Sequence, residues 1–282
     1  MSGKRIRTGC VIGVFLALCI VFGIYDLQIS AAVFHPSWRV LHVLESLGML
    51  AAPVFLIFSG VCIVAATKNR QYRISKIATG MICIAVSAGY CVIVAADVSV
   101  IVSVVFSLCT ALAVFLFVRY LSRASDQVCD RLLQISWTYL LAVVFTLVSV
   151  CVLKLFWGRV RFRQLGAADD FSPWFLPQGV TGFVSFPSGH TANAALLFIL
   201  ALLVPDIKHR AGKWVCYALP AVWTIVMAAS RVMIGAHYAS DVLFGAVISF
   251  CSLYAAKWIV LKKRAQLCTA KCNQKNKKRS HF

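Results

Sequence analysis

Repeated apolar runs of about 20 residues, the length that crosses a bilayer core as a helix, constrain this chain more than any other feature. Hydrophobic residues make up 61% of its 282 residues, and only 13% are charged. We therefore expect an all-α fold, a polytopic membrane helical bundle with eight transmembrane helices. The expected spans are 9–25, 47–66, 77–96, 98–118, 132–153, 191–204, 214–230 and 238–260.

The division between the third and fourth expected spans depends on a single charged residue. Asp97 is the only charge between residues 77 and 118. We expect it to form the hairpin turn between two helices, because a charge is costly inside the bilayer. Without that turn, seven spans would remain.

The loops that are rich in lysine and arginine alternate along the chain, and such loops face the cytoplasm. We therefore expect both termini to be cytoplasmic, together with the second, fourth and sixth connections. Their cations are Lys4, Arg5, Arg7, Lys68, Arg70, Arg73, Lys76, Arg119, Arg123, Arg131, Lys208, Arg210, Lys213 and those of the tail from Lys262. Because topology and anionic lipid account for most of the net charge of +19, it does not indicate a nucleic-acid partner.

One basic segment lies on the opposite, extracytoplasmic side. The connection from 154 to 190 contains Lys154, Arg159, Arg161 and Arg163. Lys154 and Arg161 are candidate anion ligands, while Arg159 and Arg163 either assist them or meet lipid head groups. A cation cluster on this side indicates an anion site.

The segment "SRVMIGAHYASD", residues 230–241, lies on the same expected side. His237 and Asp241 are four residues apart, which places them on one face of a starting helix. A carboxylate bound to one ring nitrogen leaves the other as a lone pair for nucleophilic attack. The alternative is a structural pair that closes the helix end. Arg231 either holds a phosphate with its planar fork or anchors the membrane edge.

The segment "FPSGH", residues 186–190, begins another apolar helix. Pro187 suits the helix start, Ser188 is a candidate cap, and Gly189 allows close approach of a ligand. The first N–H groups of a helix favour an anion, beside which His190 is placed to donate a proton. By itself this tetrapeptide also fits a solvated helix cap.

These three segments together resemble the active-site pattern of the type 2 phosphatidic acid phosphatase (PAP2) superfamily of lipid phosphatases, which vanadium haloperoxidases share. The pattern is KxxxxxxRP, PSGH and SRxxxxxHxxxD, and ten of its eleven specified residues are present in order. Phe162 replaces the proline, which removes a rigid turn next to Arg161. The resemblance covers roughly residues 150–260. We divide the chain into N-terminal spans (1–131), a PAP2-like core (132–261) and a basic tail (262–282).

The resemblance implies a mechanism with no metal and no other cofactor. His237 would attack phosphorus and form a phosphohistidine, Asp241 would orient it, and His190 would protonate the leaving group. The implied ligands of the phosphoryl oxygens are Lys154, Arg161, Ser188, Gly189 and Arg231.

The expected protein is a lipid phosphate or diphosphate phosphatase at the outer face of a bacterial cell membrane, where the lipid bilayer supplies its substrate. Candidate substrates are undecaprenyl diphosphate, phosphatidylglycerophosphate, phosphatidic acid and lipid A phosphates. The alternatives are a phosphoryl or head-group transferase and a non-catalytic anion transporter. The aromatic loop 171–183 either borders a lateral entry for the lipid tail or anchors the interface.

Overall fold

The computed structural model describes residues 2–65, 73–167 and 170–279, and its regular secondary structure within these ranges is entirely helical. Eight helical segments in them are long and apolar enough to span a membrane, which confirms the expected bundle and its eight spans. Lys68 and Arg70, counted above among the cytoplasmic cations, lie outside the described residues. The elements are α1 (Ser2–Val33), α2 (Arg39–Leu47), η1 (Gly48–Leu50), α3 (Ala51–Ala65), α4 (Arg73–Val98), α5 (Val100–Arg123), α6 (Asp126–Trp157), η2 (Phe162–Gln164), α7 (Gly189–Ala195), η4 (Leu196–Asp206), α8 (Arg210–Met233) and α9 (Ala239–Arg279).

Helix α1 continues well beyond the predicted end of the first span at residue 25. Asp26 follows that predicted end, and an isolated carboxylate is costly among apolar residues. In the structure Asp26 is fully buried and paired with a cation, so the helix continues past it.

The break between α4 and α5 confirms two separate spans, but the prediction that Asp97 forms the turn is wrong. Helix α4 includes Asp97 and ends at Val98. The chain turns at Ser99, whose side chain caps α5 by accepting a hydrogen bond from the Val102 N–H at 3.1 Å. A serine hydroxyl satisfies a free N–H at a helix start, which a residue inside the preceding helix cannot do.

Helix α2 is a short element that the sequence did not predict. It precedes η1 and α3, and its buried Leu41 packs against Ile234 and Ala236 in the connection between α8 and α9. This contact fixes α2 at one end of the bundle, next to the third motif.

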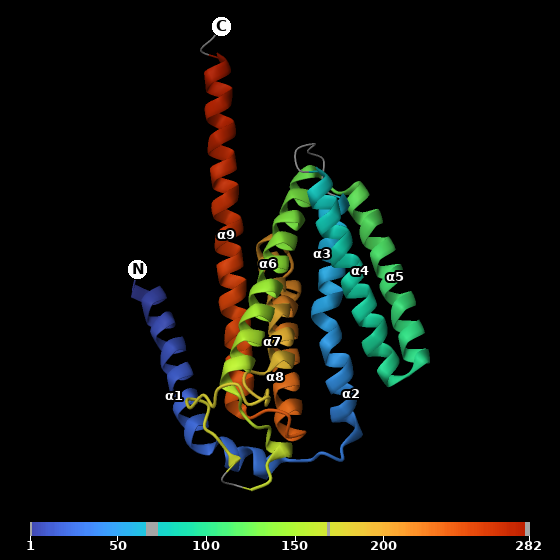
Figure 1. Cartoon of the computed structure of the whole chain (residues 1–282). Helices are drawn as coiled ribbons and strands as arrows, with labels where there is room; N and C mark the ends of the chain where they lie inside the picture. The colour runs from blue at the N-terminus through green and yellow to red at the C-terminus, as the bar shows by residue number, and fades with distance from the viewer. Residues whose placement is uncertain (1, 66–72, 168–169, 280–282) are drawn as a thin grey trace.

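All three motif segments lie at that same end. Figure 1 shows the α1–α2, α6–α7 and α8–α9 connections together at the lower end of the bundle, whereas α9 projects beyond the opposite end. Gly158 terminates α6 in the left-handed region with φ +56°, and a Cβ there would lie 2.2 Å from the Gly179 carbonyl oxygen. A glycine is therefore needed where the chain enters the basic segment.

Candidate active site

Main-chain hydrogen bonds join the three motif segments to one another. Each segment donates to or accepts from another, so their relative positions do not depend on side chains alone. The bonds run from Arg163 N to Gly235 O at 3.0 Å, from Ser185 N to Arg159 O at 3.0 Å and from Ser188 N to Asp241 O at 2.9 Å.

His237 is buried, and only 3% of it is exposed. Its Nδ1 lies 2.6 Å from the Ser185 carbonyl oxygen and 3.6 Å from Asp241 Oδ2. Because a carbonyl only accepts, we assign the ring proton to Nδ1, which leaves the lone pair on Nε2. The prediction that both residues lie on one helix face is wrong, since α9 begins at Ala239. A carbonyl of the second segment, and not the carboxylate alone, fixes the tautomer.

Asp241 is fully buried and makes three short polar contacts besides its approach to His237. Arg159 donates to Oδ1 at 2.6 Å, while the Ser185 hydroxyl at 2.6 Å and the Tyr238 N–H at 2.9 Å donate to Oδ2. These donors stabilise the charged carboxylate at a fixed position beside the imidazole.

Arg159 is the functional residue that sequence reasoning undervalued. It is too deeply buried to meet lipid head groups, because it is 1% exposed and pairs with Asp26 of α1 at 3.0 Å. Asp26 also accepts hydrogen bonds from the Ser240 backbone N–H, at 2.9 Å, and from its hydroxyl. The sequence signal was Asp26 itself, a carboxylate within an apolar helix that requires a buried partner.

The remaining motif cations gather around the two histidines. His190 interacts electrostatically with Arg231, His237 and Lys154, and His237 does so with Lys154 and Arg161. The Nε of Arg161 is buried and has no hydrogen-bond partner among the described residues. Lys154 donates to the Val184 carbonyl. The structure thus brings the predicted cations together.

Arg231 is fully buried and turns toward α2. Its Nη2 donates to the Leu41 carbonyl at 3.0 Å, and its Nη1 lies 3.1 Å from a carboxylate oxygen of Glu45. His190 also meets α2, because its Nε2 lies 3.1 Å from the Glu45 carbonyl oxygen. No sequence motif pointed to Glu45, which lies far from both residues in the chain.

Ser188 caps α7 as predicted. It is fully buried, and its hydroxyl accepts from the Thr191 N–H at 3.4 Å and lies 3.1 Å from the Thr191 hydroxyl. Its carbonyl packs against Gly245 of α9, where a Cβ would come within 2.4 Å of the oxygen. Gly189 follows as the first residue of the helix, and an added Cβ would meet only Val150, at 3.8 Å.

Phe162, the departure from the family pattern, begins the short helix η2. Its ring makes edge contacts with Phe34 at 5.1 Å and Tyr238 at 6.3 Å between centroids. The preceding Arg161 is extended, with φ −75° and ψ 149°, which is the conformation that a residue before proline adopts. At this position the aromatic packing of Phe162 therefore replaces the rigid proline ring of the family pattern.

The aromatic loop 171–183 divides into docked and exposed side chains. Trp174 donates its indole N–H to the Cys19 carbonyl at 3.1 Å and packs on Phe244, with 4.7 Å between centroids. Phe175 is 52% exposed. Trp174 thus attaches the loop to α1 and α9, whereas Phe175, Leu176, Val180 and Phe183 are exposed.

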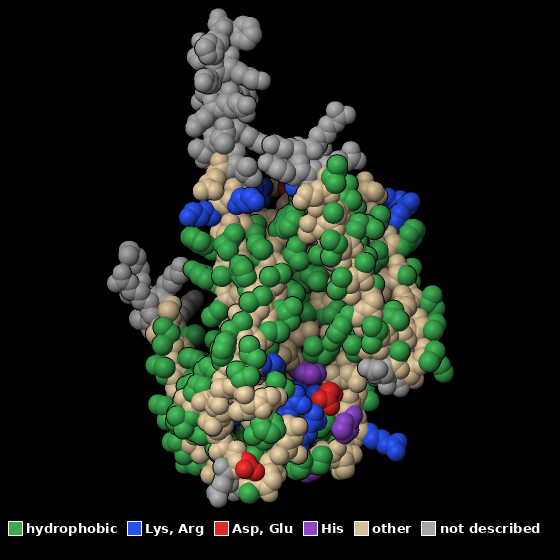
Figure 2. Space-filling view, viewed as in Figure 1, with side chains coloured by type: hydrophobic (Ala, Val, Ile, Leu, Met, Phe, Trp, Pro, Cys, Tyr) green, Lys and Arg blue, Asp and Glu red, His purple; other side chains and the backbone are tan. Residues whose placement is uncertain are grey.

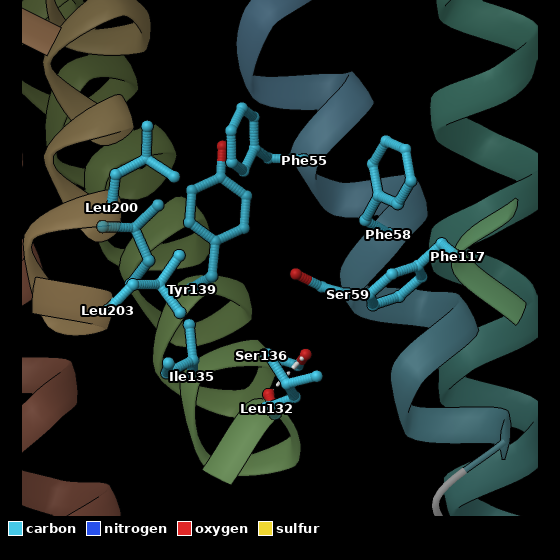
Figure 3. A pocket seen from close by; sticks show the side chains of 11 residues that line it. Phe55, Phe58, Ser59, Phe117, Leu132, Ile135, Ser136, Tyr139, Leu200 and Leu203 are labelled. Atoms are coloured by element: carbon cyan, nitrogen blue, oxygen red, sulfur yellow. Dashed lines mark hydrogen bonds between the residues drawn. The ribbon is translucent and has the colours of Figure 1, made fainter. Parts of the chain in front are cut away.

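Two pockets lie outside the histidine and arginine cluster. An apolar pocket of about 110 Å³ lies between α3, α5, α6 and η4, with Phe55, Phe117 and Tyr139 in its lining (Figure 3). A second pocket, of about 250 Å³, lies within the basic connection, with Gly158 and Phe183 in its lining. Within residues 2–65, 73–167 and 170–279, no group of three or more His, Cys, Asp or Glu side chains is arranged to hold a metal ion.

The electrostatics favour a neutral imidazole at His237. Burial lowers the pKa of the His237 imidazole below its ordinary value, Lys154 and Arg161 act in the same direction, and Asp241 opposes them. Figure 2 shows Lys and Arg side chains near the upper end of the visible face, and charged and histidine side chains toward its lower end, with a hydrophobic band between them. The site therefore combines a neutral imidazole with surrounding cations, next to the apolar band.

Residues 135–265 match the family model described as the PAP2 superfamily. A lipid A 1-phosphatase of Rhizobium johnstonii is 38% identical over 120 residues, which are 40% of this chain and 44% of the relative. A lipid A 4'-phosphatase of Rhizobium etli is 36% identical over 135 residues, which are 44% of this chain and 49% of the relative. Phosphatidylglycerophosphatase B of Escherichia coli is 33% identical over 105 residues, covering 36% of this chain and 39% of the relative.

The chain thus matches less than half the length of each of these relatives. No solved structure shows a significant match to it. Helices α1 and α2 lie outside the residues that match the family model. Both nevertheless contact residues of the motif segments.

Proposed function

Since residues 135–265 belong to the PAP2 superfamily, we propose that this multi-pass membrane protein is a phosphatase of membrane lipid phosphates that works through a phosphohistidine. The observation that carries the proposal is the 2.6 Å contact of His237 Nδ1 with the Ser185 carbonyl, beside a buried Asp241. That contact holds the proton on Nδ1 and leaves Nε2 to attack phosphorus.

The first chemical step is attack of His237 Nε2 on phosphorus. The N–P bond forms as the P–O bond to the leaving group breaks, and protonated His190 gives its proton to the departing oxygen. In the second step neutral His190 takes a proton from a water molecule, whose oxygen attacks phosphorus and releases His237. Asp241 stabilises the imidazole orientation in both steps.

The cations supply the charge stabilisation of this reaction. Lys154, Arg161 and Arg231 would hold the phosphoryl oxygens, with Ser188 and Gly189 completing the site. Gly189 would do so with its backbone N–H, and Ser188 through its cap of α7, because its own N–H donates to the Asp241 carbonyl. The buried and unpartnered Nε of Arg161 supports this role, because a phosphoryl oxygen would satisfy it. We propose that these groups replace a metal ion in the mechanism.

The relatives suggest the substrate class, since their names specify lipid A phosphatases and a phosphatidylglycerophosphatase. We propose a phosphate ester or diphosphate at the head of a membrane lipid. We propose that the active site faces the extracytoplasmic side. The distribution of Lys and Arg supports this, because Lys208, Arg210 and Lys213 lie where η4 joins α8, and basic connections face the cytoplasm. The motif segments lie in the connections on either side of this one along the chain, which therefore face the opposite side.

The test is inorganic phosphate release from phosphatidic acid, phosphatidylglycerophosphate, undecaprenyl diphosphate and lipid A by the purified chain in detergent with EDTA. We expect release from at least one lipid, and loss of at least a thousandfold in His237→Ala. Asp206→Asn is the control, because Asp206 makes an exposed ion pair with Arg131 near the start of α6, whereas Lys154 of the proposed site is near the end of that helix. Loss of activity on adding EDTA would overturn the metal-free mechanism.

The same assay separates hydrolysis from group transfer. Phosphate release that proceeds fully without an added acceptor alcohol supports hydrolysis. Turnover that requires the alcohol and yields its phosphate ester would show a transferase. No turnover, with or without acceptor, on every lipid of the panel would overturn the proposed function.

A further inference from the structure

Helix α2 contacts the residues that we assign to phosphate binding and proton donation. Its carbonyl groups at Leu41 and Glu45 accept from Arg231, at 3.0 Å, and from His190, at 3.1 Å. The buried Leu41 side chain fixes this position against Ile234. Glu45 is thereby held beside the phosphate site.

The Glu45 carboxylate pairs with the arginines of two motif segments. Its Oε1 lies 3.1 Å from Arg231 Nη1 and 3.9 Å from Arg163 Nη1, and it interacts electrostatically with Arg161. The side chain is 29% exposed, whereas that of Arg231 is fully buried. An anion that approaches Arg231 therefore meets an anion of the protein itself.

The pair between Glu45 and Arg231 is close but poorly aligned. Arg231 Nη1 is buried and has no hydrogen bond of good geometry among the described residues, although the carboxylate oxygen is 3.1 Å away. A contact that is mainly Coulombic loses no directed hydrogen bond when a phosphoryl oxygen replaces it. Arg231 keeps its bond to the Leu41 carbonyl during such an exchange.

We propose that Glu45 is an internal competitor of the phosphate site, which an entering lipid phosphate must displace from Arg231. This inference rests on the proposed function. A phosphate monoester carries about 1.5 to 2 negative charges near neutral pH, so it competes well with one carboxylate. A phosphodiester head group carries a single charge and has two blocked oxygens, so it competes poorly.

The consequence concerns the surrounding bilayer, where phosphodiester lipids are in large excess. Lys154, Arg161 and Arg231 would attract these head groups as well as the substrate. Glu45 weakens the binding of every anion. The dissociation constant of the phosphodiesters then exceeds their concentration in the bilayer, so they leave the site empty. The more highly charged monoester still binds.

The first test compares the wild type with Glu45→Gln, which keeps the shape and removes the charge. Phosphatidic acid, at concentrations from below to above its KM, is the substrate in detergent micelles, with increasing dioleoylphosphatidylglycerol as inhibitor. We expect the KM and the inhibition constant of the phosphodiester to fall about tenfold in Glu45→Gln. A galactosyl diacylglycerol without phosphate corrects for dilution of the substrate in the micelle, and Asp206→Asn is the matched charge control.

Unchanged constants in Glu45→Gln, within twofold of wild type, would overturn the inference. A higher KM would do the same, because Glu45 would then help to hold the substrate.

Half-maximal thermal stabilisation by inorganic phosphate provides a second measurement that does not depend on turnover. It should require several-fold less phosphate in Glu45→Gln, even if the wild type hydrolyses no lipid and the proposed function fails; an unchanged requirement would overturn the inference on its own.

Discussion

Arg159 and Asp241 form a buried ion pair, with 2.6 Å between Nη1 and Oδ1, and Asp26 of α1 binds the other end of the same guanidinium. The carboxylate beside His237 is therefore positioned from a helix outside the segment that matches the family model. Asp26, Arg159 and Asp241 therefore form a buried triad. A charge of this triad that lost its partner would be buried without compensation, which is strongly destabilising.

Replacing Arg159 by leucine should destabilise the protein strongly. The carboxylates of Asp26 and Asp241 would remain buried without their cation, at a cost of about 3–5 kcal/mol in the free energy of unfolding. Chemical denaturation in detergent measures it. Asp206→Asn, which breaks an exposed ion pair, should cost roughly 0–1 kcal/mol. Equal losses in the two variants would contradict the buried triad.

Ser185→Ala should lower kcat by about tenfold or more and change KM little. The variant removes the hydroxyl that donates to Asp241 Oδ2 at 2.6 Å, and a hydrogen bond to a charged group contributes about 1.5–3 kcal/mol. The backbone carbonyl that holds His237 remains. Ser30→Ala is the matched control, because the buried Ser30 hydroxyl has no hydrogen-bond partner among the described residues. A KM effect without a kcat effect would argue against this role.

The acid limb of the pH dependence of kcat/KM should lie below the ordinary histidine value of about 6.5. The nucleophile must be unprotonated, and burial lowers the pKa of His237, so it loses its proton at a lower pH than an exposed imidazole. Activity should therefore persist as the pH falls through 6.5 and decline only below it. The profile is corrected for ionisation of the substrate phosphate, measured by ³¹P NMR. A corrected limb at or above about 6.5 would disprove the expected shift.

Gly245→Ala should impair activity by displacing the turn that contains Ser188. The new Cβ would lie 2.4 Å from the Ser188 carbonyl oxygen, so α9 and the start of α7 must separate. We expect kcat/KM to fall at least tenfold and the thermal midpoint to fall as well. Gly89→Ala on α4 is the control, because its Cβ would have no neighbour within 4 Å. Wild-type activity in Gly245→Ala would show that this contact is not needed.

The membrane bundle follows from the sequence alone, because apolar runs long enough to span a bilayer have few other stable folds. The motif residues His190, His237 and Asp241 were also identified from the sequence, because the order of three short segments and the spacing within each match the family pattern. The structure brings these residues together at one end of the bundle.

The partners that complete the site depend on tertiary packing. Asp26 meets Arg159 across 133 positions of the chain, and Glu45 meets Arg231 from α2. Periodicity and motif spacing report on neighbours within one helix or loop, whereas these contacts depend on how separate helices pack. The same reason explains the hydrogen-bond partner of His237. The spacing predicted a helical pair with Asp241, whereas the packing of a second segment supplied the Ser185 carbonyl.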